Sequence, residues 1–504
     1  MRGRSTMCTG GGNSGNGGNG SPRIRPRRRS SILLTAFVAA AALAQDGIAH
    51  AYSGARRDWG LGRLLTRTGA SLRNHTVNAS DARPAGKEAN MGDAPTLGYG
   101  LIGVGMMGQE HIKNLNLLRQ DGDRVCVAAM SDPEPKSIAE AKELISKEEG
   151  QPMPAEYSDF GDLINDPNVH VLVISTPNVH HVEVLRLAIA SGKHILVEKP
   201  MCTTPEHCLE VEELLRSSGK YGPDGSIYWV AMEYRYIRPI TRMLEVADGG
   251  DVGKVRMVSI REHRYPFLIK VGNWNRFSAN TGGTLVEKCC HFFDLMLRIT
   301  GSAPVRVFAS GAVDVNHQDE TYDGAVPDII DNAYVLVDFE NGSRACLDLC
   351  MFAEASEHQE ELCIVGDRGK VEAKVPVNEV TIGIRGTSPI DWIPPPEEER
   401  TLIKEEAHVS DRLLGAGYHE GSTYWEHKRL YEIINMPAGD AKRKPDVSMQ
   451  DGLMSVMVGA AAEKSVREGR HVMLSELVPD NIRQHTAATV ASRIARLNEA
   501  ARLA

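Results

Sequence analysis

Three side chains able to give or take a proton recur at helical spacing in one segment of the chain. Glu287, His291 and Asp294 stand at i, i+4 and i+7, so a helix over 284–299 would project all three from one face. Histidine changes its charge near neutral pH, which suits it to accept or return a proton during a reaction. The segment therefore has a geometry suited to proton transfer, although Asp294 fits a structural cap or a helix-surface partner better than a chemical role.

A lysine at the end of a predicted strand is the second chemical candidate. Lys199 follows a short apolar strand predicted over 194–197, in the sequence Glu198-Lys199-Pro200. Open α/β sheets place their chemistry at the C-terminal ends of parallel strands. A Lys ammonium there can stabilise negative charge on a reacting oxygen, or relay a proton if burial lowers its pKa. The alternative is a solvated charge at a strand end.

A glycine-rich turn precedes both candidates along the chain. From Leu97 an apolar strand runs into Gly103-x-Gly105-x-x-Gly108 and then into a helix with apolar residues at helical spacing. Gly103 permits the tight turn, Gly105 lets the backbone approach a pyrophosphate, and Gly108 lets the helix pack on the sheet. The helix N-terminus supplies N–H donors and a positive dipole end. This pattern predicts a dinucleotide-binding turn.

Asp132 is the candidate for recognising the ribose of that dinucleotide. It follows a strand predicted over 125–130 and stands near the expected separation of about 20 residues from the glycines. A carboxylate accepts hydrogen bonds from a ribose 2′-hydroxyl and repels a 2′-phosphate, which favours NAD and leaves NADP open. The alternative for Asp132 is a turn residue before Pro133.

Four sequence blocks follow one another in a fixed order. They are the glycine turn at 103–108, Thr176-Pro177-Asn178 with His181, Glu198-Lys199-Pro200, and the segment 282–294. Together they resemble the Gfo/Idh/MocA oxidoreductase family, from about residue 96 to about residue 474. The resemblance implies an α/β fold, with an N-terminal Rossmann dinucleotide-binding domain and a C-terminal α/β domain built on a large, mostly antiparallel open sheet.

The resemblance also implies an activity and a set of site residues. The expected reaction moves a hydride between a nicotinamide cofactor, NAD or NADP, and a hydroxyl or keto carbon of a sugar, inositol or related polyol. Lys199 and His291 are the implied catalytic pair. Glu287 stands where many relatives carry Asp, so it could orient His291 or bind substrate. The implied cofactor contacts are Gly103, Gly105, Met106, Met107, Gly108, Asp132, Thr176, Pro177, Asn178 and Glu198.

Two alternatives to net oxidation stay open. One is a family variant that uses bound NAD for glycoside cleavage or epimerisation without net redox change. The other is a non-catalytic nucleotide-binding protein. The presence of Lys199 together with His291 argues against the second, because neither is needed only to hold a cofactor.

The chain divides into four predicted regions. They are a targeting leader and linker at 1–94, the Rossmann domain at 95–233, a substrate and oligomerisation domain at 234–475, and a helical tail at 476–504. In the third region, alternating apolar residues predict successive strands of one broad sheet, with a hairpin at Asn341-Gly342. In the family a partner subunit often covers the outer face of such a sheet, so a homo-oligomer is expected. Candidate substrate contacts there are Arg235, Tyr236, Tyr424 and His427, with packing as the alternative for Arg235 and Tyr236.

The first residues resemble a targeting leader. A cluster of arginines at 23–29 precedes an apolar run at 32–44 and a small-x-small site, Ala49-His50-Ala51, which is the order found in a signal peptide. The run is shorter than the roughly 20 residues that span a bilayer, so no membrane span is expected in the mature chain. The arginine-rich stretch at 52–73 resembles a transit peptide. Together they predict import into the secretory pathway, with a plastid as one end point. Secretion and a mitochondrial presequence are the alternatives.

The overall composition argues against two other classes of protein. The 504 residues include 57 Lys and Arg against 66 Asp and Glu, for a net charge of −9, which does not favour nucleic acid as a partner. The nine cysteines include no Cys-x-x-Cys pair, so no zinc ribbon or disulfide framework is indicated. Cys289, Cys290 and His291 are adjacent and, on a helix, cannot face one ion. No metal is expected.

Overall fold

The computed structural model describes residues 96–385 and 401–478. The predicted leader and linker lie outside these residues, as does the predicted tail beyond residue 478. Within the two described stretches, no helix combines the length and the apolar character needed to cross a bilayer.

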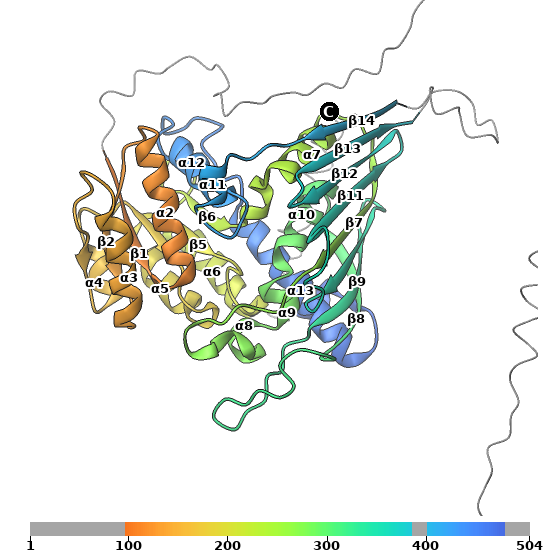
Figure 1. Cartoon of the computed structure of the whole chain (residues 1–504), viewed down its shortest axis with the longest axis horizontal. Coiled ribbons are helices and arrows are strands. Elements are labelled where there is room, and N and C mark those ends of the chain that lie inside the picture. The colour runs from red at the N-terminus through yellow and green to blue at the C-terminus, as the bar shows by residue number, and fades with distance from the viewer. Residues whose placement is uncertain (1–95, 386–400, 479–504) are drawn as a thin grey trace, which may run out of the picture. The chain divides into compact units, whose positions relative to one another are not determined.

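Six parallel strands form the first sheet, in the order β3-β2-β1-β4-β5-β6 (Figure 1). The chain moves outward from β1 in both directions, so the carboxyl ends of β1 and β4 flank the point where the strand order reverses, which is where such sheets bind ligands. The predicted Rossmann sheet is confirmed. Its strands are β1 Leu97–Ile102, β2 Val125–Ser131, β3 Ala155–Glu156, β4 Val171–Ile174, β5 His194–Glu198 and β6 Tyr228–Ala231.

Helices cover both faces of the first sheet, which explains the unbroken apolar run of β4. Leu172 and Ile174 pack into one hydrophobic core, whereas Val171 and Val173 pack into another. Strands buried on both faces need this pattern. The helices of this half are α2 Met106–Gln120, α3 Pro135–Ser146, α4 Phe160–Asn165, α5 His181–Ser191 and α6 Pro205–Ser218.

Nine strands form the second sheet, in the order β14-β13-β12-β11-β7-β10-β9-β8-β15. Among its described strands only β7 and β10 pair in parallel, so the predicted, mostly antiparallel sheet is confirmed, including the hairpin at Asn341-Gly342 between β9 and β10. The strands are β7 Val255–His263, β8 Pro304–Ala312, β9 Asn332–Phe339, β10 Arg344–Cys350, β11 Glu360–Gly366, β12 Gly369–Val375, β13 Glu379–Ile384, β14 Thr401–Glu406 and β15 Val472–Met473.

One face of the second sheet is covered by helices and the other is not. Helices α7 Arg238–Asp248, α10 Cys290–Thr300 and α13 Met449–Glu468 pack on the inner face (Figure 1). On the outer face, Met257, Tyr334 and Leu336 are each more than half exposed. Because side chains alternate along a strand, this face is a continuous surface running across several strands.

The single helix predicted over 284–299 is wrong in one respect. The segment forms two helices, α9 Thr284–Glu287 and α10, separated by a widened turn. There the N–H of Cys289 donates to the carbonyl of Thr284 at 3.3 Å, five residues back instead of four. The extra residue rotates α10 relative to α9, so Glu287 and His291 do not stand in simple i, i+4 register.

A late segment of the chain returns from the second sheet to the first half. After β14 it forms α11 Asp411–Leu414 and α12 Ser422–Ile434, and α12 packs along α2. Polar contacts fix it: Arg412 and Tyr424 both bind Asp121 at the end of α2, and Lys428 binds Asp123. The loop between α11 and α12 is thereby held close to the glycine turn.

Candidate active site

The glycine turn has the shape that its sequence predicts. Gly103 adopts a φ of +88°, which favours glycine. A Cβ at Gly108 would lie 2.4 Å from the carbonyl oxygen of Gly103, whereas a Cβ at Gly105 would meet no heavy atom within 4 Å among the described residues. Helix α2 begins at Met106, so its first N–H groups face the open side of the turn. This cradle fits the pyrophosphate of a dinucleotide.

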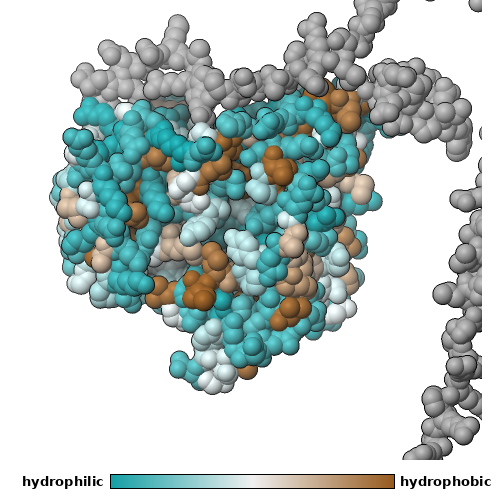
Figure 2. All heavy atoms as spheres, in the orientation of Figure 1, coloured by the Kyte–Doolittle hydropathy of each residue, from teal (hydrophilic) through white to brown (hydrophobic). Residues whose placement is uncertain are grey.

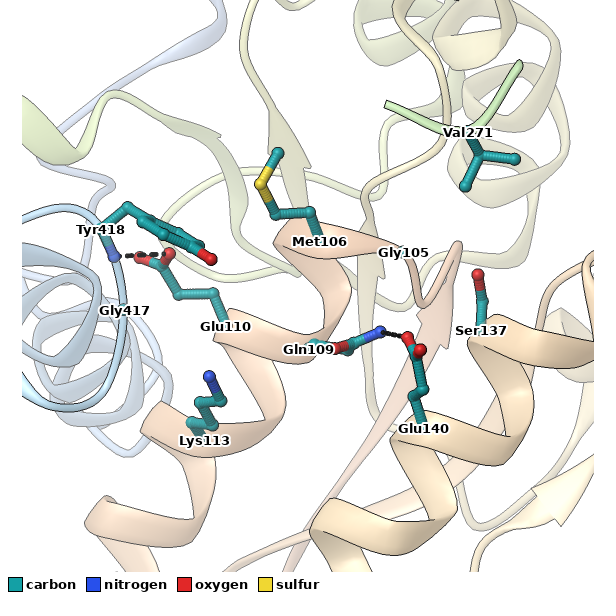
Figure 3. A pocket seen from close by; sticks show the side chains of 10 residues that line it. All are labelled: Gly105, Met106, Gln109, Glu110, Lys113, Ser137, Glu140, Val271, Gly417 and Tyr418. Atoms are coloured by element: carbon teal, nitrogen blue, oxygen red, sulfur yellow. Dashed lines mark hydrogen bonds between the residues drawn. The ribbon is translucent and has the colours of Figure 1, made fainter. Parts of the chain in front are cut away.

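A cavity of about 190 Å³ adjoins the turn (Figure 3). Its walls come from both halves of the chain: Gly105 and Met106 at the turn, Ser137 from α3, and Val271 and Tyr418 from the second half. In Figure 3 the carboxylate of Glu110 reaches from α2 toward the backbone of Tyr418, to which it is hydrogen-bonded at 3.0 Å. The second half therefore covers part of the nucleotide-binding turn.

Asp132 lies beside the glycine turn, at the end of β2. Its two carboxylate oxygens accept N–H groups from Val104, at 2.7 Å, and from Glu134, at 2.8 Å. The contact with Glu134 is the turn geometry expected as the alternative for this residue, and the contact with Val104 ties it to the turn. Each oxygen keeps a further lone pair, so Asp132 can still accept hydrogen bonds from a ribose.

The segment after β4 presents unused polar atoms next to the turn. The hydroxyl of Thr176 and the amide nitrogen of Asn178 are buried and lack a hydrogen-bond partner within the described residues. His181 holds this segment against the end of β5, since its ring nitrogens contact the carbonyls of Thr176 at 3.0 Å and Pro200 at 2.9 Å. Buried polar groups normally have partners, so these atoms fit a ligand. Pro177 directly precedes the short helical turn that begins at Asn178.

Glu198 is held by a chain of two histidines. His111 contacts the Glu198 carboxylate at 3.0 Å and His427 at 2.9 Å, and all three are buried. Burial opposes charge on Glu198, but the hydrogen bond from His111 and the positive charges of His111, Lys199 and His419 together outweigh it and hold the pKa of the carboxyl below its usual value. His427 thus reaches the site through His111 and Glu198.

The pKa values of Lys199 and His291 are shifted in opposite directions, although both groups lie near Glu233. Burial by itself lowers the pKa of Lys199, but nearby acidic groups, Cys290 and Glu233 foremost, raise it above its usual value. Burial, reinforced by the charge of Lys199, holds the pKa of His291 well below its usual value. The site therefore contains an ammonium that stays charged near an imidazole that stays neutral.

The ring of His291 is positioned by the turn that follows β6. It stacks on Tyr234, with ring centres 4.3 Å apart, and its Nε2 lies 3.4 Å from the carboxylate of Glu233. Glu287 faces a different partner, the ammonium of Lys270, at 3.1 Å. The second carboxylate oxygen of Glu287 is buried and has no hydrogen-bond partner in the described part of the chain.

Comparison with known proteins identifies the family. Residues 97–222 match the oxidoreductase family with an NAD-binding Rossmann fold, and residues 245–474 match the C-terminal alpha/beta domain of the same family. The chain belongs to the Gfo/Idh/MocA oxidoreductase family.

Individual relatives of this Gfo/Idh/MocA chain agree with that assignment. It is 28% identical over 383 residues to myo-inositol 2-dehydrogenase of Thermotoga maritima, covering 75% of this chain and 99% of the relative. An oxidoreductase domain protein from Kribbella flavida has a TM-score of 0.63 at 20% identity, covering 76% of this chain and 100% of that one. Levoglucosan dehydrogenase, solved with NADH and levoglucosan, has a TM-score of 0.61 at 18% identity, covering 75% and 99%. At these identities the two structures establish the fold.

Three of the candidate substrate residues are engaged elsewhere in this Gfo/Idh/MocA chain. Arg235 is buried and forms a bidentate ion pair with Asp294, so packing is the better interpretation of it. Asp294 is correspondingly a buried partner, not a surface one. Tyr236 stacks on Trp229, and Tyr424 binds Asp121 at the far end of α2 from the glycine turn.

Two residues of the site were missed by the sequence interpretation. Glu233 follows β6, and a carboxylate at the end of a parallel strand is a signal that could have been used. His419 comes from the loop between α11 and α12 and lies 3.4 Å from Glu233. No local pattern indicates His419, because its position depends on the packing of α12 on α2.

Proposed function

We propose that the chain is an NAD-dependent dehydrogenase or reductase acting on a hydroxyl-bearing carbon of a polyol, inositol or sugar. The observation that carries this proposal is the placement of a half-buried, charged Lys199 and a buried, neutral His291 around Glu233, beside a dinucleotide turn. The likeness to an enzyme named myo-inositol 2-dehydrogenase supports the polyol class.

The two charge states have separate roles in the proposed reaction. When bound, NAD supplies the acceptor for the hydride that leaves the carbinol carbon. The hydroxyl proton must leave by another route, and the neutral imidazole of His291 accepts it. Lys199 stabilises the negative charge that develops on the oxygen. Since its pKa is raised, we assign Lys199 to charge stabilisation, not to proton relay.

Glu287 fits substrate binding better than orientation of His291. Its first oxygen pairs with Lys270, whereas Tyr234 and Glu233 position His291. The buried second oxygen lacks a partner among the described residues, so it would accept a hydrogen bond from a substrate hydroxyl. A polyol offers several such hydroxyls.

Asp132 favours NAD over NADP in this proposal. The carboxylate lies at the end of β2, against the glycine turn, where a 2′-phosphate would meet a like charge. Glu198, held by His111, would bind the nicotinamide ribose, as the family resemblance implies.

A homo-oligomer is part of the proposal. The outer face of the nine-stranded sheet exposes Met257, Phe308, Tyr334 and Leu336, whereas the face drawn in Figure 2 is mostly hydrophilic, with apolar residues in separate patches. A second copy covering the sheet would remove this apolar surface from water.

The function is tested with the purified full chain and a panel of inositols, other polyols and sugars. Absorbance of reduced nicotinamide is followed with NAD and then with NADP. One reduced nicotinamide released per substrate oxidised supports net oxidation. Conversion of substrate without release of reduced nicotinamide favours the redox-neutral variant. Binding of NAD without any conversion of substrate favours a non-catalytic protein.

A further inference from the structure

A buried carboxylate separates two imidazoles beside the catalytic candidates. The same oxygen of Glu233 lies 3.4 Å from Nε2 of His291 and 3.4 Å from Nε2 of His419. Neither oxygen of Glu233 has a hydrogen-bond partner among the described residues. A buried carboxylate without hydrogen bonds is costly, so its place between two groups that exchange protons calls for an explanation.

His419 is firmly held on its other side. Its Nδ1 contacts Glu110 of α2 at 2.8 Å. Glu110 also accepts the backbone N–H of Tyr418 at 3.0 Å and the hydroxyl of Thr423 at 2.7 Å. These contacts fix the ring between two carboxylates, with one nitrogen toward each.

The three groups run from the interior toward solvent. The side chains of His291 and Glu233 are 1% and 2% exposed, whereas that of His419 is 19% exposed. A proton that reaches His419 can therefore pass to water, and one that stays on His291 cannot.

The charges around His419 keep it ready to hold a proton. The groups that face it are Glu110 from α2, Glu233 from the turn after β6, Glu198 and Lys199 from the end of β5, His291 from α10, and the adjacent Glu420. Burial and Lys199 oppose a positive charge, but Glu110 and Glu233 outweigh them and raise the pKa of His419. In turn, although burial opposes charge on Glu110, the charge and hydrogen bond of His419 help to lower the pKa of Glu110 to about 2.

We propose that Glu233 and His419 carry the proton between His291 and solvent. The proposal rests on the proposed function, since it gives that reaction's proton a way out of a closed site. Both residues act through His291, so they are positioning and proton-transfer groups and need not touch the substrate.

The steps balance for oxidation of an alcohol. The substrate O–H bond breaks and an N–H bond forms on His291, while the electron pair of the broken C–H bond leaves with the hydride. His291 passes its proton to the carboxylate of Glu233. His419 releases a proton to water and regains one from Glu233. One proton is released per turnover, and all three groups return to their starting charges.

The test compares full-length variants with the substrate identified by the panel. His419→Gln should lower kcat for oxidation by about tenfold while KM changes by no more than about twofold, and the solvent isotope effect on kcat should increase. In His419→Ala, added imidazole should restore kcat, because the position is partly exposed. His471→Gln, which changes an exposed histidine directly before β15, is the matched control and should behave as the wild type.

The pH dependence gives a second readout. Release of the proton from His419 becomes easier as the pH rises, so the oxidation rate should rise through the raised pKa of His419, above its usual value of about 6.5. Glu110→Gln removes one carboxylate that raises this pKa, so it should move the rising limb to lower pH. A His419→Gln profile and isotope effect equal to the wild type would overturn the proposal, as would a failure of imidazole to restore a folded His419→Ala.

Titration of the histidine resonances by NMR separates this proposal from the proposed function. In the substrate-free enzyme, the resonance lost in His419→Gln identifies His419, and Glu233→Gln should lower its midpoint. If no polyol is oxidised but the midpoint still moves, the proposed function fails and the proton path has no reaction to serve, although the electrostatic contact between Glu233 and His419 is confirmed. If the midpoint does not move, the proton path fails whatever the substrate is. If Lys270→Met shifted the pH profile and Glu110→Gln did not, the proton would leave the site through Glu287. That result would also overturn the proposed path through Glu233 and His419.

Discussion

Arg235 and Asp294 form a buried bidentate ion pair that joins the turn after β6 to helix α10. The guanidinium donates to both carboxylate oxygens, at 2.6 and 2.5 Å, and to the carbonyl of Asp446 at 2.6 Å. Because Glu233 and Tyr234 precede Arg235, and His291 lies three residues before Asp294, this pair fixes the surroundings of the candidate base.

Asp294→Asn should therefore destabilise the protein more than an exposed ion pair would. Removing the charge takes away the bidentate partner of a buried guanidinium and leaves it the more distant carboxylate of Asp451, at 3.8 Å. We expect the free energy of unfolding, measured by urea denaturation, to fall by about 3–5 kcal/mol. Asp248→Asn is the control, because it breaks the bidentate pair of Asp248 with Arg298, which lies on α10 like Asp294. That pair is exposed, and its loss should cost about 1 kcal/mol or less. Equal losses would contradict the structural role.

Lys199→Ala should separate catalysis from cofactor binding. Loss of the ammonium removes charge stabilisation at the reacting oxygen, so kcat should fall by about 10²–10³-fold. NAD affinity, measured by calorimetry, should stay within a few-fold, because the glycine turn holds the cofactor. An equal loss of kcat and of affinity would show that Lys199 is a binding residue and contradict its assigned role.

Asp132→Asn tests the choice of cofactor. The amide keeps an acceptor for the turn but loses the negative charge, so KM for NAD should rise about tenfold and the preference for NAD over NADP should shrink. Steady-state kinetics with both cofactors measure the change. Glu149→Gln, which changes an exposed acid after α3, should leave both constants unaltered. An unchanged ratio in Asp132→Asn would remove the basis for the NAD assignment.

Leu336→Asp tests the outer face of the second sheet. Leu336 lies on β9 between Phe308 and Cys346 on the neighbouring strands, and a charge there would oppose a packed interface. We expect a smaller assembly by analytical ultracentrifugation. Leu187→Asp changes an equally apolar, 49% exposed residue on α5 and should sediment as the wild type. Identical sedimentation of both variants would rule out this face as the interface.

Local patterns predict the parts of the site that are built locally. The glycine turn, the strand that ends at Glu198 and the hairpin at Asn341-Gly342 each depend on neighbouring residues, and each is found where expected. The break after Glu287 is different. The N–H of Leu285 in α9 donates to Glu463 of α13 at 3.0 Å, so a contact distant along the chain helps position α9.

The positions of His419 and His427 in the site share that long-range origin. His419 reaches Glu233 only because Arg412, Tyr424 and Lys428 attach their segment to the end of α2. His427 reaches Glu198 through His111 for the same reason. Such positions follow from tertiary packing, which periodicity and motif spacing do not encode.

The nucleotide-binding half is completed by a segment from the second half of the chain, α11 to α12. Its Tyr418 and Gly417 help line the cavity at the glycine turn, and its Glu426 accepts the indole N–H of Trp229 in β6 at 3.1 Å. A chimaera that exchanged only residues 97–231 for those of another dehydrogenase would face a mismatched lining. Any transfer of this half to another protein therefore has to include residues 411–434, although they are distant from it along the chain.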